Sequence, residues 1–102
     1  MSAMADEQWA REVAGAMARA GFDEAHYTLL PDRTIGLTGN WQTMMEGMAG
    51  RLEDLGIHVE VYLLQPGNSR VGYRLTLAAP GTARGVTTIP VASIDDVPVA
   101  YR

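Results

Sequence analysis

The sequence lacks cysteine, and all eight of its basic residues are arginine. Without cysteine the chain has no disulfide bond, no thiolate ligand for a metal and no thiol nucleophile. Coding bias in a GC-rich genome is the simpler explanation for the missing lysine. Selection for the planar, bidentate contacts of the guanidinium group is the alternative.

Long apolar stretches are also missing. No segment approaches the roughly 18 consecutive apolar residues that suggest a membrane-spanning helix. The first residues do not combine a basic segment with an apolar run, so the pattern of a signal peptide is absent. We therefore expect a cytoplasmic protein that does not enter a membrane.

Acidic residues outnumber basic ones, and they are unevenly distributed. The formal net charge is −4, with ten acids against four arginines in residues 1–60 and two acids against four arginines in residues 61–102. Binding to phosphate backbones requires a basic surface. Direct nucleic-acid binding is therefore not expected of the acidic part of the chain.

The overall composition is that of an ordinary globular domain. Apolar residues make up 47% of the 102 residues and charged residues 20%. A chain of this length buries about 65% of its unfolded surface, which is enough for a single hydrophobic core. We predict one domain, with a core in residues 1–79. Residues 80–102 are expected to form a loop followed by an edge strand or a partner-binding tail.

The middle of the chain has the clearest pattern of apolar residues. From Trp41 to Leu55 they recur with a helical period, Asn40 is a suitable N-cap, and Gly56 is a suitable helix end. The period then changes to two in residues 57–64 and again in residues 71–78. A Gln-Pro-Gly-Asn-Ser turn separates these two runs, which predicts a β-hairpin.

The same succession of elements is predicted in the first part of the chain. Residues 2–20 have an amphipathic helical pattern that ends at Gly21, and residues 25–30 and 34–38 form two short alternating runs. Every fourth residue of part of this helix is alanine, at Ala10, Ala14 and Ala18. This stripe admits a close partner helix, although alanine is also simply a good helix former.

The predicted fold is α+β with the order α-β-β-α-β-β, followed by one optional strand. We expect two helices packed on one face of a four- to five-stranded antiparallel sheet. The alternation places one set of side chains on the opposite, solvent-facing side of the sheet: His58, Glu60, Tyr62, Leu64, Arg74 and Thr76.

The sequence contains no catalytic constellation. Its three serines lie in no nucleophile motif, and His26 and His58 lack a metal-binding spacing, so we predict no enzyme activity, no metal and no cofactor. One weak anion site is suggested where a strand leads into a helix N-terminus. The residues of this candidate anion site are Gly36, Thr38, Gly39 and Asn40.

Protein binding is the leading functional hypothesis, either to a partner protein or to a second copy in a homodimer. The first alternative is an acidic inhibitor of bacterial or phage origin, of the anti-CRISPR kind, that fills a basic nucleic-acid-binding groove. The second alternative is a small-molecule or phosphate binder at the anion site. The candidate residues for protein interaction are Glu46, Glu53, Asp54, Tyr62, Leu64 and Arg74.

Overall fold

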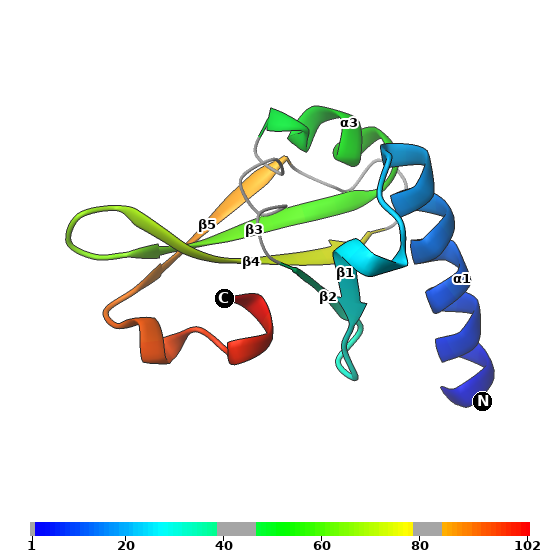
Figure 1. Cartoon of the computed structure of the whole chain (residues 1–102), viewed down its shortest axis with the longest axis horizontal. Coiled ribbons are helices and arrows are strands. Elements are labelled where there is room, and N and C mark those ends of the chain that lie inside the picture. Colours follow the sequence, from blue (N-terminus) through cyan, green and yellow to red (C-terminus); the bar gives the residue numbers. More distant parts are fainter. Residues whose placement is uncertain (1, 39–46, 79–84) are drawn as a thin grey trace.

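The computed structural model of the chain describes residues 2–38, 47–78 and 85–102 (Figure 1). Within these residues the main elements follow the order that the sequence predicts, with two helices and five strands. The same residues include three short 3-10 helices, at Glu24–His26, Ile94–Asp96 and Val99–Tyr101. No helix in the described part of the chain is long and apolar enough to cross a membrane.

Helix α1 spans Ser2–Ala20, as its pattern predicts. The apolar stripe through Val13 and Met17 is fully buried. The helix ends at Gly21, whose φ of 98° is a conformation that glycine adopts without strain. Backbone bonds from Gly21 to Ala18 and from Phe22 to Met17 then satisfy two of the last carbonyl groups.

The second predicted helix is only partly within the described residues. Helix α3 spans Ala49–Asp54, and the predicted positions 40–46 lie outside the described residues. Close approach of another backbone is one possible reason for the glycines at positions 47 and 50. Among the described residues, a Cβ atom at either position would meet nothing within 4 Å, so this part of the structure gives no support for it.

Both predicted hairpins are present. Strands β1 (Tyr27–Leu29) and β2 (Thr34–Leu37) form the short one, and β3 (Ile57–Leu64) and β4 (Ser69–Leu77) form the long one. Strand β2 also pairs with β4, which joins the two hairpins into one sheet with the order β1-β2-β4-β3-β5.

The prediction of a purely antiparallel sheet is wrong, because strand β5 (Val86–Val91) pairs in parallel with β3. The edge of β4 that a following strand could use is already occupied by β2. Strand β5 lies instead on the free side of β3, where it forms one edge of the sheet. Because β5 runs opposite to β4, it runs parallel to β3, and the sheet is mixed.

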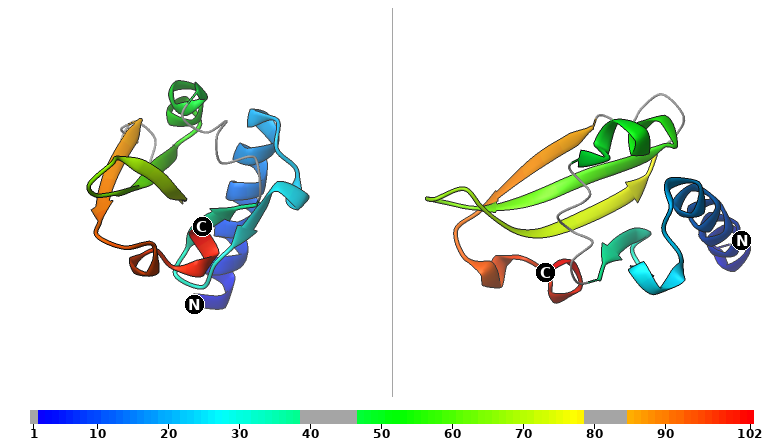
Figure 2. Two further views of the ribbon diagram at one scale, coloured as in Figure 1. Left: turned by 60° about the vertical axis from the view of Figure 1, so that its left-hand side comes forward. Right: turned by 45° about the horizontal axis from the view of Figure 1, so that its top comes forward.

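Both helices contribute to a single core on one face of the sheet, as predicted. Residues of α1, Leu52 of α3 and the inward-facing residues of the strands belong to the same buried cluster. The inward strand residues with no exposed surface are Ile35, Ile57, Val59 and Leu75. Figure 2 shows α3 on one side of the β3–β4 hairpin and the C-terminal end of the chain on the other.

The opposite face of the sheet is not open to solvent as predicted. Residues 93–102, which we call the C-terminal segment, turn back from β5 and pack on this face. Val97 and Tyr101 of the segment form a second small cluster with Tyr62 of β3, and Tyr62 is only 5% exposed. The segment is therefore part of the folded domain.

Candidate functional site

Tyr101 is the anchor of the C-terminal segment. Its ring stacks on that of Tyr62, with centroids 6.0 Å apart and an interplanar angle of 21°. Its hydroxyl group hydrogen-bonds to the Thr34 hydroxyl and lies 3.3 Å from a carboxylate oxygen of Asp32. Burial raises the pKa of Tyr101, and the hydrogen bond from the Thr34 hydroxyl lowers the pKa of Asp32.

Arg74 and Glu60 form an ion pair beside this anchor. Two nitrogens of Arg74 donate to the two carboxylate oxygens of Glu60, each at 2.8 Å. This bidentate geometry raises the pKa of Arg74 above its usual value. The guanidinium carbon also lies 5.9 Å from the centre of the Tyr101 ring, within cation–π distance. Arg74 is thus engaged within the domain.

Two glycines allow the segment to lie directly on the sheet. A Cβ atom on Gly36 would lie 2.5 Å from the carbonyl oxygen of Ala100, and one on Gly72 would lie 2.6 Å from that of Tyr101. Both distances are too short for any larger residue. A glycine inside a predicted strand is a signal for such close approach, and this signal was present in the sequence.

The predicted interaction residues therefore have different environments. Tyr62 is buried and Arg74 is paired, so the expectation that both lie on an open face is wrong; Leu64 is half-buried at the end of β3. Glu53 and Asp54 are exposed on α3, and Glu46 lies outside the described residues. The five of these residues that lie in the described part of the chain do not form one surface.

The candidate anion site is only half within the described residues, since Gly39 and Asn40 lie outside them. Gly36 is buried in β2 beneath the C-terminal segment. The Thr38 N–H donates to the carbonyl of His26 at 3.0 Å, and the Thr38 hydroxyl donates to the carbonyl of Ala25. These donors are therefore already used within the domain.

The two histidines have local roles. The His26 ring accepts a hydrogen bond from the Asp23 N–H at 3.1 Å, and the His58 ring lies 2.9 Å from the Thr87 hydroxyl. Within residues 2–38, 47–78 and 85–102, no three histidine or carboxylate side chains gather in a way that suits a metal ion.

Strand β5 is an open edge of the sheet (Figure 2), and an edge strand was one of the two expectations for the end of the chain. The N–H of Val59 donates to the Gly85 carbonyl, and the N–H of Gln65 donates to the Val91 carbonyl. The backbone groups along a strand alternate between its two sides. Val86, Thr88 and Pro90 therefore direct their backbone groups away from β3.

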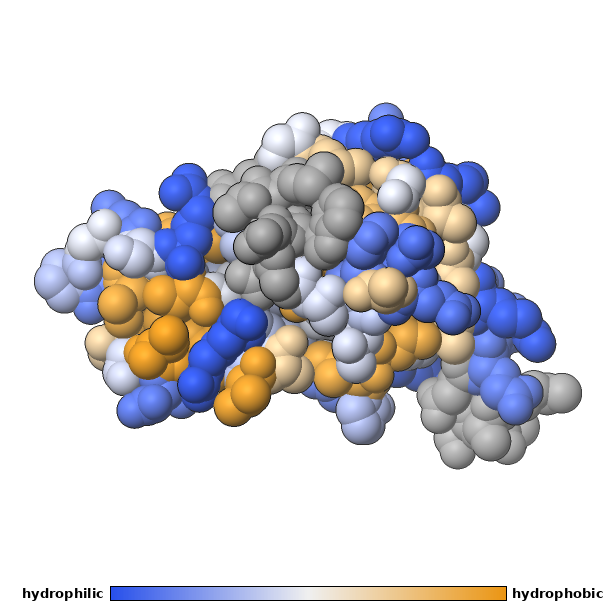
Figure 3. All heavy atoms as spheres, viewed as in Figure 1, coloured by the Kyte–Doolittle hydropathy of each residue, from blue (hydrophilic) through white to orange (hydrophobic). Residues whose placement is uncertain are grey.

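Apolar side chains lie on both faces of this edge. Val86 and Ile94 are 37% and 46% exposed, and Ile89 and Val91 are half-buried against the Tyr62 cluster. Figure 3 shows hydrophobic surface at the end of the molecule where β5 and the β3–β4 hairpin lie. Strand β5 itself carries no charged residue.

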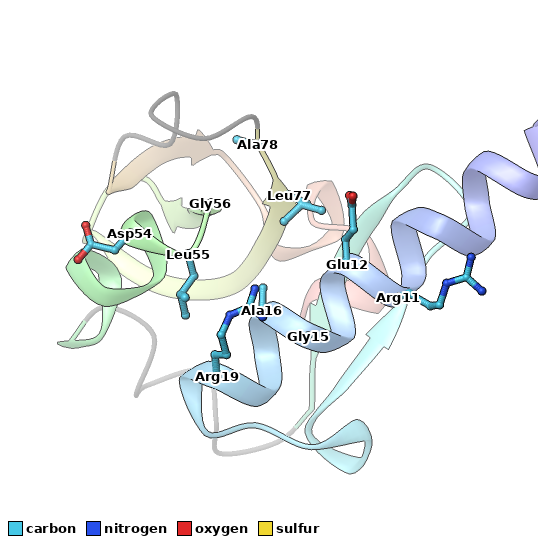
Figure 4. Close-up of a pocket in the computed structure, with 10 residues that line it drawn as sticks. All are labelled: Arg11, Glu12, Gly15, Ala16, Arg19, Asp54, Leu55, Gly56, Leu77 and Ala78. Atoms are coloured by element: carbon cyan, nitrogen blue, oxygen red, sulfur yellow. The ribbon is translucent and has the colours of Figure 1, made fainter.

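A pocket of about 460 Å³ lies between α1, the end of α3 and the end of β4 (Figure 4). Charged residues surround a mostly small and apolar lining. Arg19 reaches toward the hollow and Glu12 stands beside Leu77, whereas Arg11 and Asp54 point away. The complete lining is Arg11, Glu12, Gly15, Ala16, Arg19, Asp54, Leu55, Gly56, Leu77 and Ala78. The walls of this pocket come from segments that are distant in the sequence, so no local pattern indicates it.

Comparisons with protein-family models, with curated proteins and with solved structures found no significant match for this chain.

Proposed function

We propose that the protein is a non-enzymatic protein-binding domain that pairs its β5 edge with an extended segment of a partner. The observation that supports this proposal is the outward direction of the backbone groups of Val86 and Thr88 on an edge strand. Strand addition uses such groups for main-chain hydrogen bonds and uses neighbouring side chains for specificity. The apolar residues on both faces of β5 would provide this specificity.

Pro90 limits how far an added strand can pair. Proline has no N–H, and at this position no bond to β3 is lost because the missing donor would point outward. The open edge therefore offers donors at Val86 and Thr88 but none at Pro90. Such a proline is one way in which edge strands avoid indiscriminate pairing. We infer that the N-terminal half of β5 is the pairing half.

The test varies two outward-facing positions of β5, Thr88 and Pro90. A library of displayed random peptides is selected on the full-length protein, and the affinity of the selected peptides is then measured for three variants. Thr88→Pro removes an outward donor without breaking the ladder to β3, so we expect binding to weaken about tenfold. Thr88→Val keeps the donor and is the matched control. Pro90→Val adds a donor and should strengthen binding.

Hydrogen exchange gives an independent readout. A bound peptide should slow exchange at the N–H groups of Val86 and Thr88 more than at the other edge strand, β1. Equal affinity of the selected peptides for the wild type and Thr88→Pro would contradict strand addition at β5. Sedimentation of the Pro90→Val variant shows in addition whether the unblocked edge pairs with a second copy.

The acidic-inhibitor function is the second proposal. It is supported by the exposure of Glu53 and Asp54 on α3, although Arg51 lies on the same short helix. Charge reversal of Glu53 and Asp54 should abolish binding to a basic partner such as a nucleic-acid-binding enzyme. Unchanged affinity for that partner after the reversal would rule this function out.

A further inference from the structure

We propose that a second pocket, between helix α1 and strand β1, binds an uncharged aromatic compound that carries a hydroxyl group, and that Tyr27 bonds to this group (Figure 1). The volume of this pocket, about 390 Å³, falls in the usual range for small-molecule sites. The pocket shares no residue with the β5 edge, so it is independent of the proposed function. Its lining residues are Ala10, Arg11, Ala14, Glu24, Tyr27 and Leu29.

The hydroxyl group of Tyr27 is the polar feature inside this pocket. Tyr27 is only 8% exposed, and its hydroxyl group has no hydrogen-bond partner among the described residues. Every fully enclosed side-chain nitrogen or oxygen atom of those residues has a partner, so this unpartnered hydroxyl group keeps some contact with solvent. Because Tyr27 lines the pocket, we infer that this contact lies there. A ligand that fills the pocket covers the hydroxyl group and has to satisfy it.

The hydroxyl group of Tyr27 stays protonated at neutral pH. Burial raises the pKa of Tyr27, and the negative charges of Glu24 and Asp23 raise it further. Glu24 also lines the pocket, which agrees with a hydroxyl group that faces the same space. A neutral phenol can both donate and accept a hydrogen bond. A ligand hydroxyl group has the same two capacities and is therefore a suitable partner.

The walls of the pocket are apolar and suit a flat ring. Ala10 and Ala14 are one helical turn apart on α1 and both are half-buried, so they form a surface without long side chains. Leu29 and the ring of Tyr27 come from β1, and both pack with the core cluster on the side of the sheet that α1 covers. An aromatic ring can lie between these two walls, where contact with the Tyr27 ring adds to its binding.

The charges at the pocket favour an uncharged ligand. Arg11 and Glu24 both line the pocket, both are exposed, and they have opposite signs. A ligand with a single charge would be attracted by one of them and repelled by the other. Salt and water also screen exposed charges such as these. Apolar contact and the hydrogen bond to Tyr27 therefore decide which compounds bind.

The test is titration of the full-length protein with p-ethylphenol, followed by the NMR shifts of the Ala10 and Ala14 amides. We expect saturable binding, and about tenfold weaker binding of ethylbenzene, which has the same ring without the hydroxyl group. The singly charged compounds p-ethylbenzoate and p-ethylbenzylammonium should also bind more weakly than p-ethylphenol. Tighter binding of either charged compound would overturn the assignment of an uncharged ligand.

Three variants locate the site and its hydrogen bond. Tyr27→Phe keeps the ring and removes the hydroxyl group, so the affinity for p-ethylphenol should fall about tenfold while that for ethylbenzene does not fall. Ala14→Leu fills the pocket and should abolish binding of both compounds. The matched control is Ala18→Leu, because Ala18 is exposed on the same helix and does not line the pocket, so its affinity should equal that of the wild type. Absence of a saturable shift at millimolar p-ethylphenol would overturn the proposal, and so would wild-type affinity for this compound in either Tyr27→Phe or Ala14→Leu.

Discussion

The two faces of the sheet are covered in different ways. On the inner face, helices α1 and α3 bury fully enclosed aliphatic residues such as Ile35 and Leu75. On the outer face, the C-terminal segment is held by a ring stack, hydrogen bonds and two glycines that admit its backbone. Apolar burial is not directional, whereas the outer contacts depend on individual atoms. The inner face should therefore tolerate changes of shape that the outer face does not.

The largest loss of stability is expected when the inner core is truncated. Leu75 has no exposed surface, so Leu75→Ala removes buried methyl groups and leaves a cavity. We expect a loss of about 3 kcal/mol in the free energy of unfolding, measured by urea denaturation. Leu75→Met conserves volume and should cost less than about 1.5 kcal/mol. Similar losses for the two variants would show that the inner face also depends on exact shape.

The outer face should respond to the addition of a single methyl group. A Cβ atom on Gly72 would lie 2.6 Å from the Tyr101 carbonyl oxygen and 2.8 Å from Cγ1 of Val97. Gly72→Ala should therefore lift the C-terminal segment and cost about 1–3 kcal/mol of unfolding free energy. Faster hydrogen exchange in residues 97–102 is the direct measurement.

Gly50→Ala is the matched control for this change. Gly50 lies in α3, and among the described residues a Cβ atom there meets nothing within 4 Å. Because alanine favours the helix over glycine by about 1 kcal/mol, this variant should be more stable than the wild type. A destabilised Gly50→Ala variant combined with a neutral Gly72→Ala variant would reverse our interpretation of the two positions.

Removing one hydroxyl group should weaken the outer face by a smaller amount. Tyr101→Phe keeps the ring that stacks on Tyr62 and loses the contacts to Thr34 and Asp32. We expect a loss of about 1 kcal/mol in denaturant unfolding, the usual net value of a hydrogen bond. Tyr101→Ala, which also removes the ring, should cost clearly more. Equal losses would mean that the ring contributes little.

The smallest expected effect is the pH dependence that arises from Asp32. The hydrogen bond from Thr34 lowers the pKa of this carboxyl group in the folded state. Its contribution to stability is therefore complete above the ordinary aspartate pKa of about 4 and is lost as the pH falls through the lower, folded value. Unfolding measured from pH 6 to pH 2 should show a shallower loss for Asp32→Asn than for the wild type. Parallel curves would contradict this assignment.

The inner half of the fold could be predicted because it depends on periodicity. The spacing of apolar residues predicted α1 and both hairpins, and it placed Arg74 on the side of the sheet opposite the core. The parallel pairing of β5 could not be predicted in this way. It depends on which sheet edges are still free, and that is a property of the assembled sheet.

The outer face shows the same limit. Alternation placed Tyr62 on the outer side, but no local pattern indicates that residues 93–102 return to cover it. The glycines at 36 and 72 were a signal of close approach without an identified partner. The pocket beside α1 was hidden because it is formed by segments that are distant in the sequence, whereas an edge strand in residues 80–102 was among the expectations.

The sequence by itself determined where α1 and the four main strands lie and which of their sides face the core, because these properties follow from neighbouring side chains and their spacing. Tertiary structure alone decided the direction of β5, the covering of Tyr62 by Tyr101, and the pairing of Arg74 with Glu60 within a closed cluster. These features require contacts between residues far apart in the chain, and such contacts form only once the sheet has been assembled.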